Sequence, residues 1–297
     1  MKIFDRRYDR ESQHCIYEFL GIKIRVRNTF LRMQAKLDTL ELLLSLSTDV
    51  TKLSKATGKL REIQLECLKI YKLVTKICEE NNLKYWLDSG TLIGQVRHNG
   101  FIPWDDDIDL CMLRPDYEKL LSILKTELAE TDYFVRERAE RSNFFQIRII
   151  QKNSDNVGID IFPVDMYHTS HLSDDEKNLV TQKIKSAKKE FDKLNHSKYM
   201  NAFQVQKAKK DILSITKEYI LGNREPANEK PALFWGIDFL YRVKGHLIMD
   251  YDCVFPLKEA SFEDCKCYLP NQSDAYLKNI FGDYMSIPKN IVIKREV

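Results

Sequence analysis

Three aspartates have the residue type and spacing needed to bind a divalent metal ion. In WDDDIDL, Asp107 and Asp109 alternate with Ile108 and Leu110, so both carboxylates share one face at the end of an otherwise apolar strand. Asp160 has the same apolar flanks in GIDIFP. Neighbouring carboxylates repel each other unless a cation lies between them, and hard divalent ions prefer oxygen ligands. We therefore expect these three aspartates to bind Mg²⁺, with Mn²⁺ as an alternative.

A serine–glycine pair upstream is a candidate site for phosphate oxygens. Ser89 and Gly90 open a short predicted helix, TLIGQV, and backbone N–H groups at a helix N-terminus bind phosphate. The pair alone is a weak signal. With a D-x-D strand downstream and a third aspartate on a later strand, it forms the layout of the nucleotidyltransferase fold. Such a site performs phosphoryl transfer, with one or two metal ions at the attacking and leaving oxygens.

Two basic residues and a tryptophan lie between this turn and the acids in the sequence. Arg97 and His98 could neutralise a donor diphosphate, but a basic pair is equally typical of a helix C-terminus. Trp104 could stack on a base or shape a choline pocket, although such rings more often belong to the core. Arg148, in FFQIRII, either reaches the site or faces solvent. Each of these alternatives is open at this point.

The surrounding elements predict an α+β fold, with a small mixed β-sheet flanked by helices. Apolar residues at helical spacing indicate a helix from about residue 60 to 80, and Pro115 indicates the first turn of another. Strands are predicted in KYWLD, in IDLCM, in FFQIRII and in VGIDIFPVDMY, where Pro163 is expected to end the strand. A capping box at residues 173–176 predicts a lysine-rich helical insertion, and FWGIDFLYRVKGHLI predicts a further helix.

The sequence predicts two parts. Residues 1–58 form an N-terminal extension, with a short strand-like arm at residues 16–26 and an amphipathic helix at residues 30–50. Residues 59–297 form the catalytic domain. The apolar face of the amphipathic helix packs either on the same chain or on a second copy, and the second case would give a homodimer.

Composition excludes several classes of protein. With 43% hydrophobic and 31% charged residues, the chain is neither disordered nor a polytopic membrane protein. A net charge of +3 is too small for a dedicated nucleic-acid binder, so no nucleic-acid partner is expected. Seven scattered cysteines without a CxxC pair, and no signal sequence or membrane span, predict a cytoplasmic protein.

The acidic segment and its flanks resemble the LicD family, which includes bacterial phosphocholine transferases. The resemblance is carried by YWLDSGTLIGQVRHNGFIPWDDDIDLCM, by LREIQLECLKIYKLVTKICEENNLK before it and by GIDIFPVD after it. It implies transfer of a phospho-alcohol, such as phosphocholine from the CDP-alcohol donor CDP-choline, to a glycan. The acceptor would be a hydroxyl of a bacterial cell-surface glycan or its lipid-linked precursor, in lipopolysaccharide, capsule or teichoic acid. The family's motif maps onto Asp105, Asp107, Asp109 and Asp160, with Ser89 and Gly90 at the phosphate turn.

The sequence leaves open the roles of two aspartates, the function of the chain and the role of a lysine-rich stretch. Asp160 is either a metal ligand or the general base for the acceptor hydroxyl, and Asp105 is either a ligand or a residue that orients one. The same fold could transfer a nucleotidyl group from an NTP, or the chain could be a non-catalytic scaffold of a glycan-synthesis complex. A lysine-rich stretch between residues 183 and 210 is either a solvated helix face or a contact with the anionic inner leaflet of the membrane.

Overall fold

The computed structural model describes residues 4–9, 14–19, 22–27, 49–137, 147–152, 157–167, 173–175, 178–179, 182, 231–235 and 248–286. The chain divides into two compact units. The first consists of residues 1–50 and 286–291, and the second of residues 51–285 and 292–297.

The first unit contains a three-stranded antiparallel sheet. Its strands are β1 (Phe4–Asp9), β2 (His14–Phe19) and β3 (Ile22–Arg27), paired in the order β1-β2-β3. The strand-like arm predicted at residues 16–26 therefore forms most of two hairpin strands. Residues 30–48 of the predicted amphipathic helix lie outside the described residues, and homodimer formation stays a prediction.

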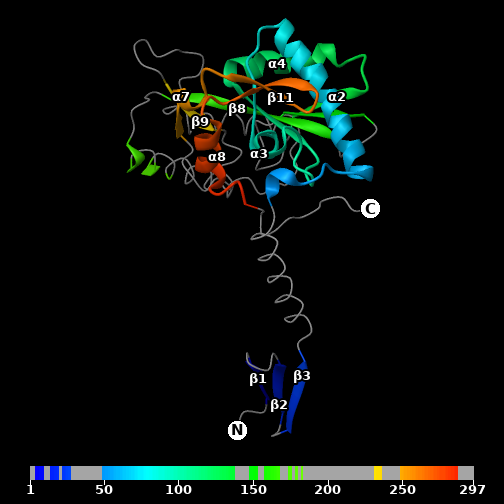
Figure 1. Ribbon diagram of the computed structural model, residues 1–297, viewed down its shortest axis with the longest axis vertical. Helices are drawn as coiled ribbons and strands as arrows, with labels where there is room; N and C mark the ends of the chain where they lie inside the picture. The colour runs from blue at the N-terminus through cyan, green and yellow to red at the C-terminus, as the bar shows by residue number, and fades with distance from the viewer. Residues whose placement is uncertain are drawn as a thin grey trace, which may run out of the picture. The chain divides into compact units, whose positions relative to one another are not determined.

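The second unit is built on a seven-stranded mixed sheet (Figure 1). Strand β8 is paired with β5 in parallel on one edge, and its other edge is paired antiparallel first with β7 and then with β9. Strand β4 extends the sheet beyond β5, while β6 and β10 extend it beyond β7 and β9. The bounds of these strands are β4 (Trp86–Leu87), β5 (Ile108–Leu113), β6 (Tyr133–Glu137), β7 (Ile147–Gln151), β8 (Gly158–Tyr167), β9 (Ala232–Trp235) and β10 (Ile248–Asp250).

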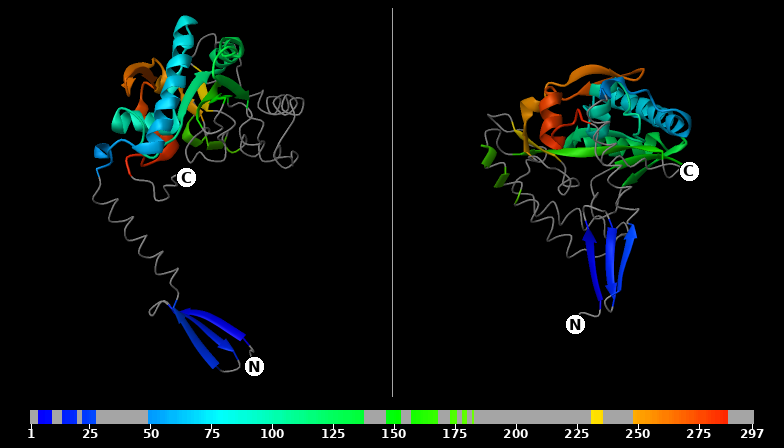
Figure 2. Two further views of the ribbon diagram at one scale, coloured as in Figure 1. Left: turned by 90° about the vertical axis from the view of Figure 1, so that its right-hand side faces the viewer. Right: turned by 60° about the horizontal axis from the view of Figure 1, so that its bottom comes forward.

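Helices pack against the central strands of this sheet (Figure 2). Helices α2 and α4 contact both β5 and β8, and α3 contacts β5. A C-terminal hairpin of β11 (Lys258–Phe262) and β12 (Cys265–Leu269) contacts β4, and α8 contacts α3. Among the described residues, the helices are η1 (Val50–Lys52), α2 (Gly58–Glu80), α3 (Ser89–His98), α4 (Arg114–Glu127), α7 (Tyr251–Val254) and α8 (Ser273–Phe281).

The predicted periodicities account for the core. The apolar stripe of α2, from Ile63 through Cys67, Ile70 and Val74 to Ile77, is buried as its helical spacing predicts. Strand β5 buries Ile108, Leu110, Cys111 and Met112. Pro115 lies in the first turn of α4, as expected from its fixed φ angle. The mixed sheet with flanking helices confirms the predicted α+β class.

Two element predictions are wrong. Pro163 does not end its strand, because β8 continues to Tyr167. The proline lies between Ile161, the last residue of β8 paired with β7, and Val164, the first paired with β9. On that edge of β8 Pro163 is paired with neither β7 nor β9, which suits a residue without an N–H, while on the other edge it lies opposite Met112 of β5. The helix predicted from residue 234 is also wrong at both ends, where β9 and β10 pair instead.

The lysine-rich insertion lies almost entirely outside the described residues, including every lysine from residue 183 to 210. Within the described part of the chain, no helix is long and apolar enough to cross a membrane.

Candidate metal and phosphate site

Asp109 and Asp160 lie opposite each other on adjacent parallel strands. They are register partners in the β5–β8 pair, so their side chains share one face of the sheet. Asp107 precedes β5 by one residue, and oxygen atoms of these three carboxylates lie within 4.8 Å of one another. The structure therefore brings together Asp107, Asp109 and Asp160, three of the four aspartates that the sequence analysis gave as candidate ligands.

Asp105 belongs to a second, overlapping group. One carboxylate oxygen each from Asp105, Asp106 and Asp107 also lie within 4.8 Å of one another. Asp106, which the sequence analysis did not select, is buried, with 5% of its surface exposed. Asp105 and Asp107 are partly exposed, and both precede β5 in the sequence.

The carboxylate cluster is electrostatically unfavourable without a cation. Burial and the neighbouring carboxylates of Asp107 and Asp160 raise the pKa of Asp109 well above its usual range. A divalent ion between the carboxylates would offset this repulsion, and an all-oxygen donor set suits Mg²⁺ or Mn²⁺. By donor type and mutual distance, the residues present fit such an ion.

Arg148 is the buried cation of the site. Its Nη1 donates to Asp160 Oδ2 at 2.8 Å, across the antiparallel pair of β7 and β8, and about 8% of its side chain is exposed. Gly158 permits this arrangement, because a Cβ there would come within 2.6 Å of Ile149 O and 3.1 Å of Arg148 Nε. Of the two positions that the sequence left open for Arg148, the structure shows the one at the site.

The predicted phosphate turn lies directly beside the acids. Helix α3 begins at Ser89, whose φ of 47° is in the left-handed region, and a Cβ at Gly90 would come within 2.4 Å of Asp105 Oδ2. The Asp109 N–H also donates to Thr91 Oγ1 at 2.8 Å. The N-terminus of α3 and the carboxylates thus form one continuous site.

Asp88 links this turn to the C-terminal part of the chain by hydrogen bonds. It is fully buried at the N-cap of α3 and accepts hydrogen bonds from Tyr276 Oη at 2.7 Å and Ser89 Oγ at 3.3 Å. Tyr276 lies on α8, near the C-terminal end of the chain. The C-terminal segment therefore contributes directly to the support of the phosphate turn.

The predicted donor-binding cations differ in character. Arg97 is buried in the last turn of α3, beside Asp283 and Tyr284, and burial lowers its pKa. Burial, together with the charge of Arg97, lowers the pKa of His98. Donor binding by Arg97 and His98 stays a prediction. Trp104 is partly buried and packs on the core, with a remaining exposed face.

Residues 82–204 match the family model of the LicD/FKTN/FKRP nucleotidyltransferase domain. This match agrees with the resemblance that the residues around the acidic segment predicted. The match contains Ser89, Gly90, the acidic segment, Arg148 and Asp160.

Two kinds of relative are similar to part of the chain. The chain is 46% identical over 81 residues to the lipopolysaccharide cholinephosphotransferase LicD of Haemophilus influenzae, covering 27% of this chain and 30% of that protein. It is 31% identical over 93 residues to the ribitol 5-phosphate transferases FKRP of Homo sapiens and Mus musculus, covering 30% of this chain and 18% of each. The chain thus spans less than a third of the length of these relatives.

The sequence analysis missed several residues that hold the site in place. Gln64 and Cys67 on α2 contact the backbone of the acidic segment, and Glu263 in the β11–β12 turn binds the segment just before it. Gln64 had a usable signal, because it is a polar residue beside the apolar stripe of α2. Glu263 had none, since it is one acid in a polar turn.

Proposed function

We propose that this protein is a Mg²⁺-dependent transferase that moves phosphocholine from CDP-choline to a hydroxyl of a bacterial cell-surface glycan or its lipid-linked precursor. The observation that carries the proposal is the register pairing of Asp109 with Asp160, with Asp107 within the same 4.8 Å cluster, next to the N-terminus of α3. Choline is the first candidate because the Haemophilus relative is named a cholinephosphotransferase.

The residues have separable roles in this reaction. Asp107, Asp109 and Asp160 would hold Mg²⁺, with Asp105 at its edge, and the ion would neutralise charge on the donor diphosphate. Backbone N–H groups at Ser89 and Gly90 would bind phosphate oxygens. Arg148 donates to Asp160 Oδ2 at 2.8 Å and so fixes the position of this carboxylate, and a carboxylate that accepts from an arginine is a weaker base. This contact favours the ligand role for Asp160 over the general-base role.

The transfer itself exchanges one P–O bond for another. The acceptor hydroxyl oxygen forms a bond to the phosphorus that carries choline, and the bond from that phosphorus to the CMP oxygen breaks. CMP leaves with the electron pair, and the hydroxyl proton is released to solvent through a carboxylate of the cluster. The phosphate turn and the acids hold the donor so that the attacking and leaving oxygens lie in line.

The test is isothermal titration calorimetry of the full chain with Mg²⁺ against CDP-choline, CDP-ethanolamine, CDP-glycerol, CDP-ribitol and CTP. We expect saturable binding of CDP-choline that is lost in Asp107→Asn and retained in the control Asp132→Asn, an exposed acid outside the site. Selective binding of another CDP-alcohol would replace choline and keep the reaction type. Binding of CTP alone, with pyrophosphate released on turnover, would replace the proposal with nucleotidyl transfer, and no nucleotide binding would support the scaffold alternative.

One further expectation belongs to this proposal. A lipid-linked acceptor would require contact with the cytoplasmic face of the membrane, which the lysine-rich stretch could provide. Flotation on anionic vesicles at low salt tests this contact, and protein that stays in the soluble fraction would contradict it.

A further inference from the structure

The acidic loop, residues 99–107, joins α3 to β5 and contains the aspartates that precede the strand. It packs against α3 at two glycines. A Cβ at Gly94 would come within 2.5 Å of Gly100 O, and a Cβ at Gly90 within 2.4 Å of Asp105 Oδ2. The loop therefore lies against the helix that forms the phosphate turn, and the path of its backbone decides where its carboxylates lie.

Gln64 of α2 binds the backbone of this loop from the other side. Its amide is completely buried, and Nε2 donates to Asp105 O at 2.9 Å and to Ile102 O at 3.2 Å. Its Oε1 accepts from Arg61 Nη1 at 3.0 Å, so both ends of the amide are occupied and its orientation is defined. Gln64 thereby holds the backbone of Asp105, the residue whose carboxylate lies against Gly90.

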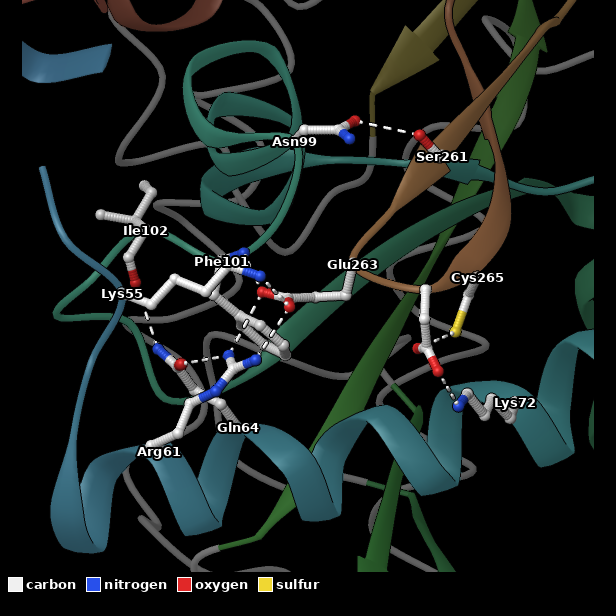
Figure 3. Close-up of polar contacts among 11 residues, drawn as sticks. Lys55, Arg61, Gln64, Lys72, Asn99, Phe101, Ile102, Ser261, Glu263 and Cys265 are labelled. Carbon is white, nitrogen blue, oxygen red and sulfur yellow. Dashed lines mark hydrogen bonds and ion pairs between the residues drawn. The ribbon is translucent and has the colours of Figure 1, made fainter. Parts of the chain in front are cut away.

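Glu263 holds the start of the same loop. Its backbone N–H donates to Asn99 O at 2.9 Å, and its Oε1 accepts from the Phe101 N–H at 3.4 Å (Figure 3). The same carboxylate accepts from Arg61 Nη2 at 2.8 Å and Lys55 Nζ at 2.6 Å, with 5% of the side chain exposed. Glu263 is the first of the two turn residues between β11 and β12, and its φ of 55° is in the left-handed region.

These contacts form one connected chain of hydrogen bonds. Glu263 fixes the Arg61 guanidinium, Arg61 fixes the Gln64 amide, and Gln64 fixes the loop at Ile102 and Asp105. Figure 3 shows Arg61 and Glu263 pointing toward each other, with Gln64 beside them. Neither α2 nor the hairpin lies in residues 82–204, the region that matches the family model.

We propose that Gln64 is a positioning residue of the transferase, which holds the acidic loop so that Asp105 and Asp107 keep their places beside the phosphate turn, and that Glu263 orients it through Arg61. This inference rests on the proposed function, in which these carboxylates bind metal and donor. Neither residue touches the reacting atoms; both act through the loop.

The hairpin itself provides a matched control. Asp264, the next residue in the turn, accepts from Lys72 of α2 at 2.8 Å, and both side chains are at least half exposed. This pair links the same hairpin to the same helix without a contact to the acidic loop. Asp264→Ala therefore removes a docking contact and leaves the positioning chain intact.

The experiment compares Gln64→Met, Glu263→Ala, Glu263→Gln and Asp264→Ala in the full chain by two measurements. Amide hydrogen exchange of peptides from residues 99–107 reports loop order, and Mn²⁺ titration followed by electron paramagnetic resonance reports metal affinity. We expect faster loop exchange and about tenfold weaker Mn²⁺ binding for Gln64→Met and Glu263→Ala, typical of residues that orient ligands. Glu263→Gln keeps an acceptor for Phe101 and Arg61, so its defect is smaller, and Asp264→Ala matches the wild type.

Two results would count against the inference. If Gln64→Met lowers thermal stability but leaves loop exchange and Mn²⁺ affinity at the level of Asp264→Ala, its role is only structural. If Glu263→Ala is indistinguishable from Asp264→Ala, the hairpin only docks. Failure of the proposed function looks different: the wild type would not bind Mn²⁺, and the exchange data would still decide the role of Gln64.

Discussion

The Asp105 carboxylate lies against Gly90 so closely that a Cβ on the glycine would come within 2.4 Å of Oδ2. This contact joins the acidic segment to the first turn of α3. It places the predicted phosphate turn directly against one of the predicted metal ligands. A glycine is needed here because there is no room for a Cβ. Its backbone conformation is not the reason, since its φ is outside the left-handed region.

Gly90→Ala should reduce donor binding much more than stability. The atom that it meets is the end of a side chain, so the Asp105 carboxylate would swing away and leave the loop backbone in place. Gly94→Ala is the contrasting variant, because its Cβ would meet backbone atoms of Gly100 and Ile102, and we expect it to lose about 1–3 kcal/mol of unfolding free energy. Titration of the CDP-alcohol and urea unfolding of both variants check this; equal stability losses would contradict it.

Arg148→Met should be strongly destabilising. It leaves Asp160 buried next to two other carboxylates without its cation, and removal of one partner of a buried ion pair costs about 3–5 kcal/mol. Asp160→Asn should cost less, because it also removes repulsion from Asp107 and Asp109. The exposed pair of Lys278 and Asp274 is the control, and Asp274→Asn should lower the unfolding free energy much less than either of these variants. Chemical denaturation of the three variants measures these losses. A larger loss for Asp160→Asn than for Arg148→Met would contradict the prediction.

A divalent ion should stabilise the folded chain. Mg²⁺ or Mn²⁺ would offset the carboxylate repulsion that raises the pKa of Asp109, and a ligand at a hundredfold excess over its Kd adds about 2.7 kcal/mol. We expect the melting temperature to rise with either ion, to fall again on chelation, and to be insensitive to both in Asp107→Asn. Asp132→Asn should respond like the wild type. A response that Asp107→Asn retains would place the ion elsewhere.

The contribution of Glu263 to stability should be lost in acid. Burial by itself raises the pKa of this carboxyl, but the hydrogen bonds from Arg61 and Lys55 outweigh it, so its pKa lies below the ordinary 4.5. A lowered folded-state pKa means that the unfolded chain takes up the proton first. The stabilisation is therefore complete above pH 4.5 and decreases as the pH falls through the folded-state pKa.

The measurement is the difference in unfolding free energy between the wild type and Glu263→Gln from about pH 3 to 7. We expect the difference to be constant near neutral pH and to shrink in acid. A difference that does not change with pH would show that the charge of Glu263 contributes nothing.

Local patterns determined the elements around the site. The apolar stripe from Ile63 to Ile77 predicted α2, Pro115 marked the first turn of α4, and the alternation around Asp107 and Asp109 placed both acids on one face. These predictions succeed because periodicity of 3.6 or 2 residues is a property of a single segment, and burial of the apolar face follows from it. The chemical type of the three aspartates was likewise readable without a structure.

Only the tertiary structure decided which segments are neighbours. The register of Asp109 with Asp160, the ion pair of Arg148 and the hydrogen bonds of Glu263 all join residues distant in the sequence. No local period specifies which strand lies beside which, or which turn reaches a given loop, because strand order is set by packing of the whole sheet. The same reason explains the error at Pro163, since the proline lies where the strand on one edge of β8 changes from β7 to β9, while the other edge stays paired with β5.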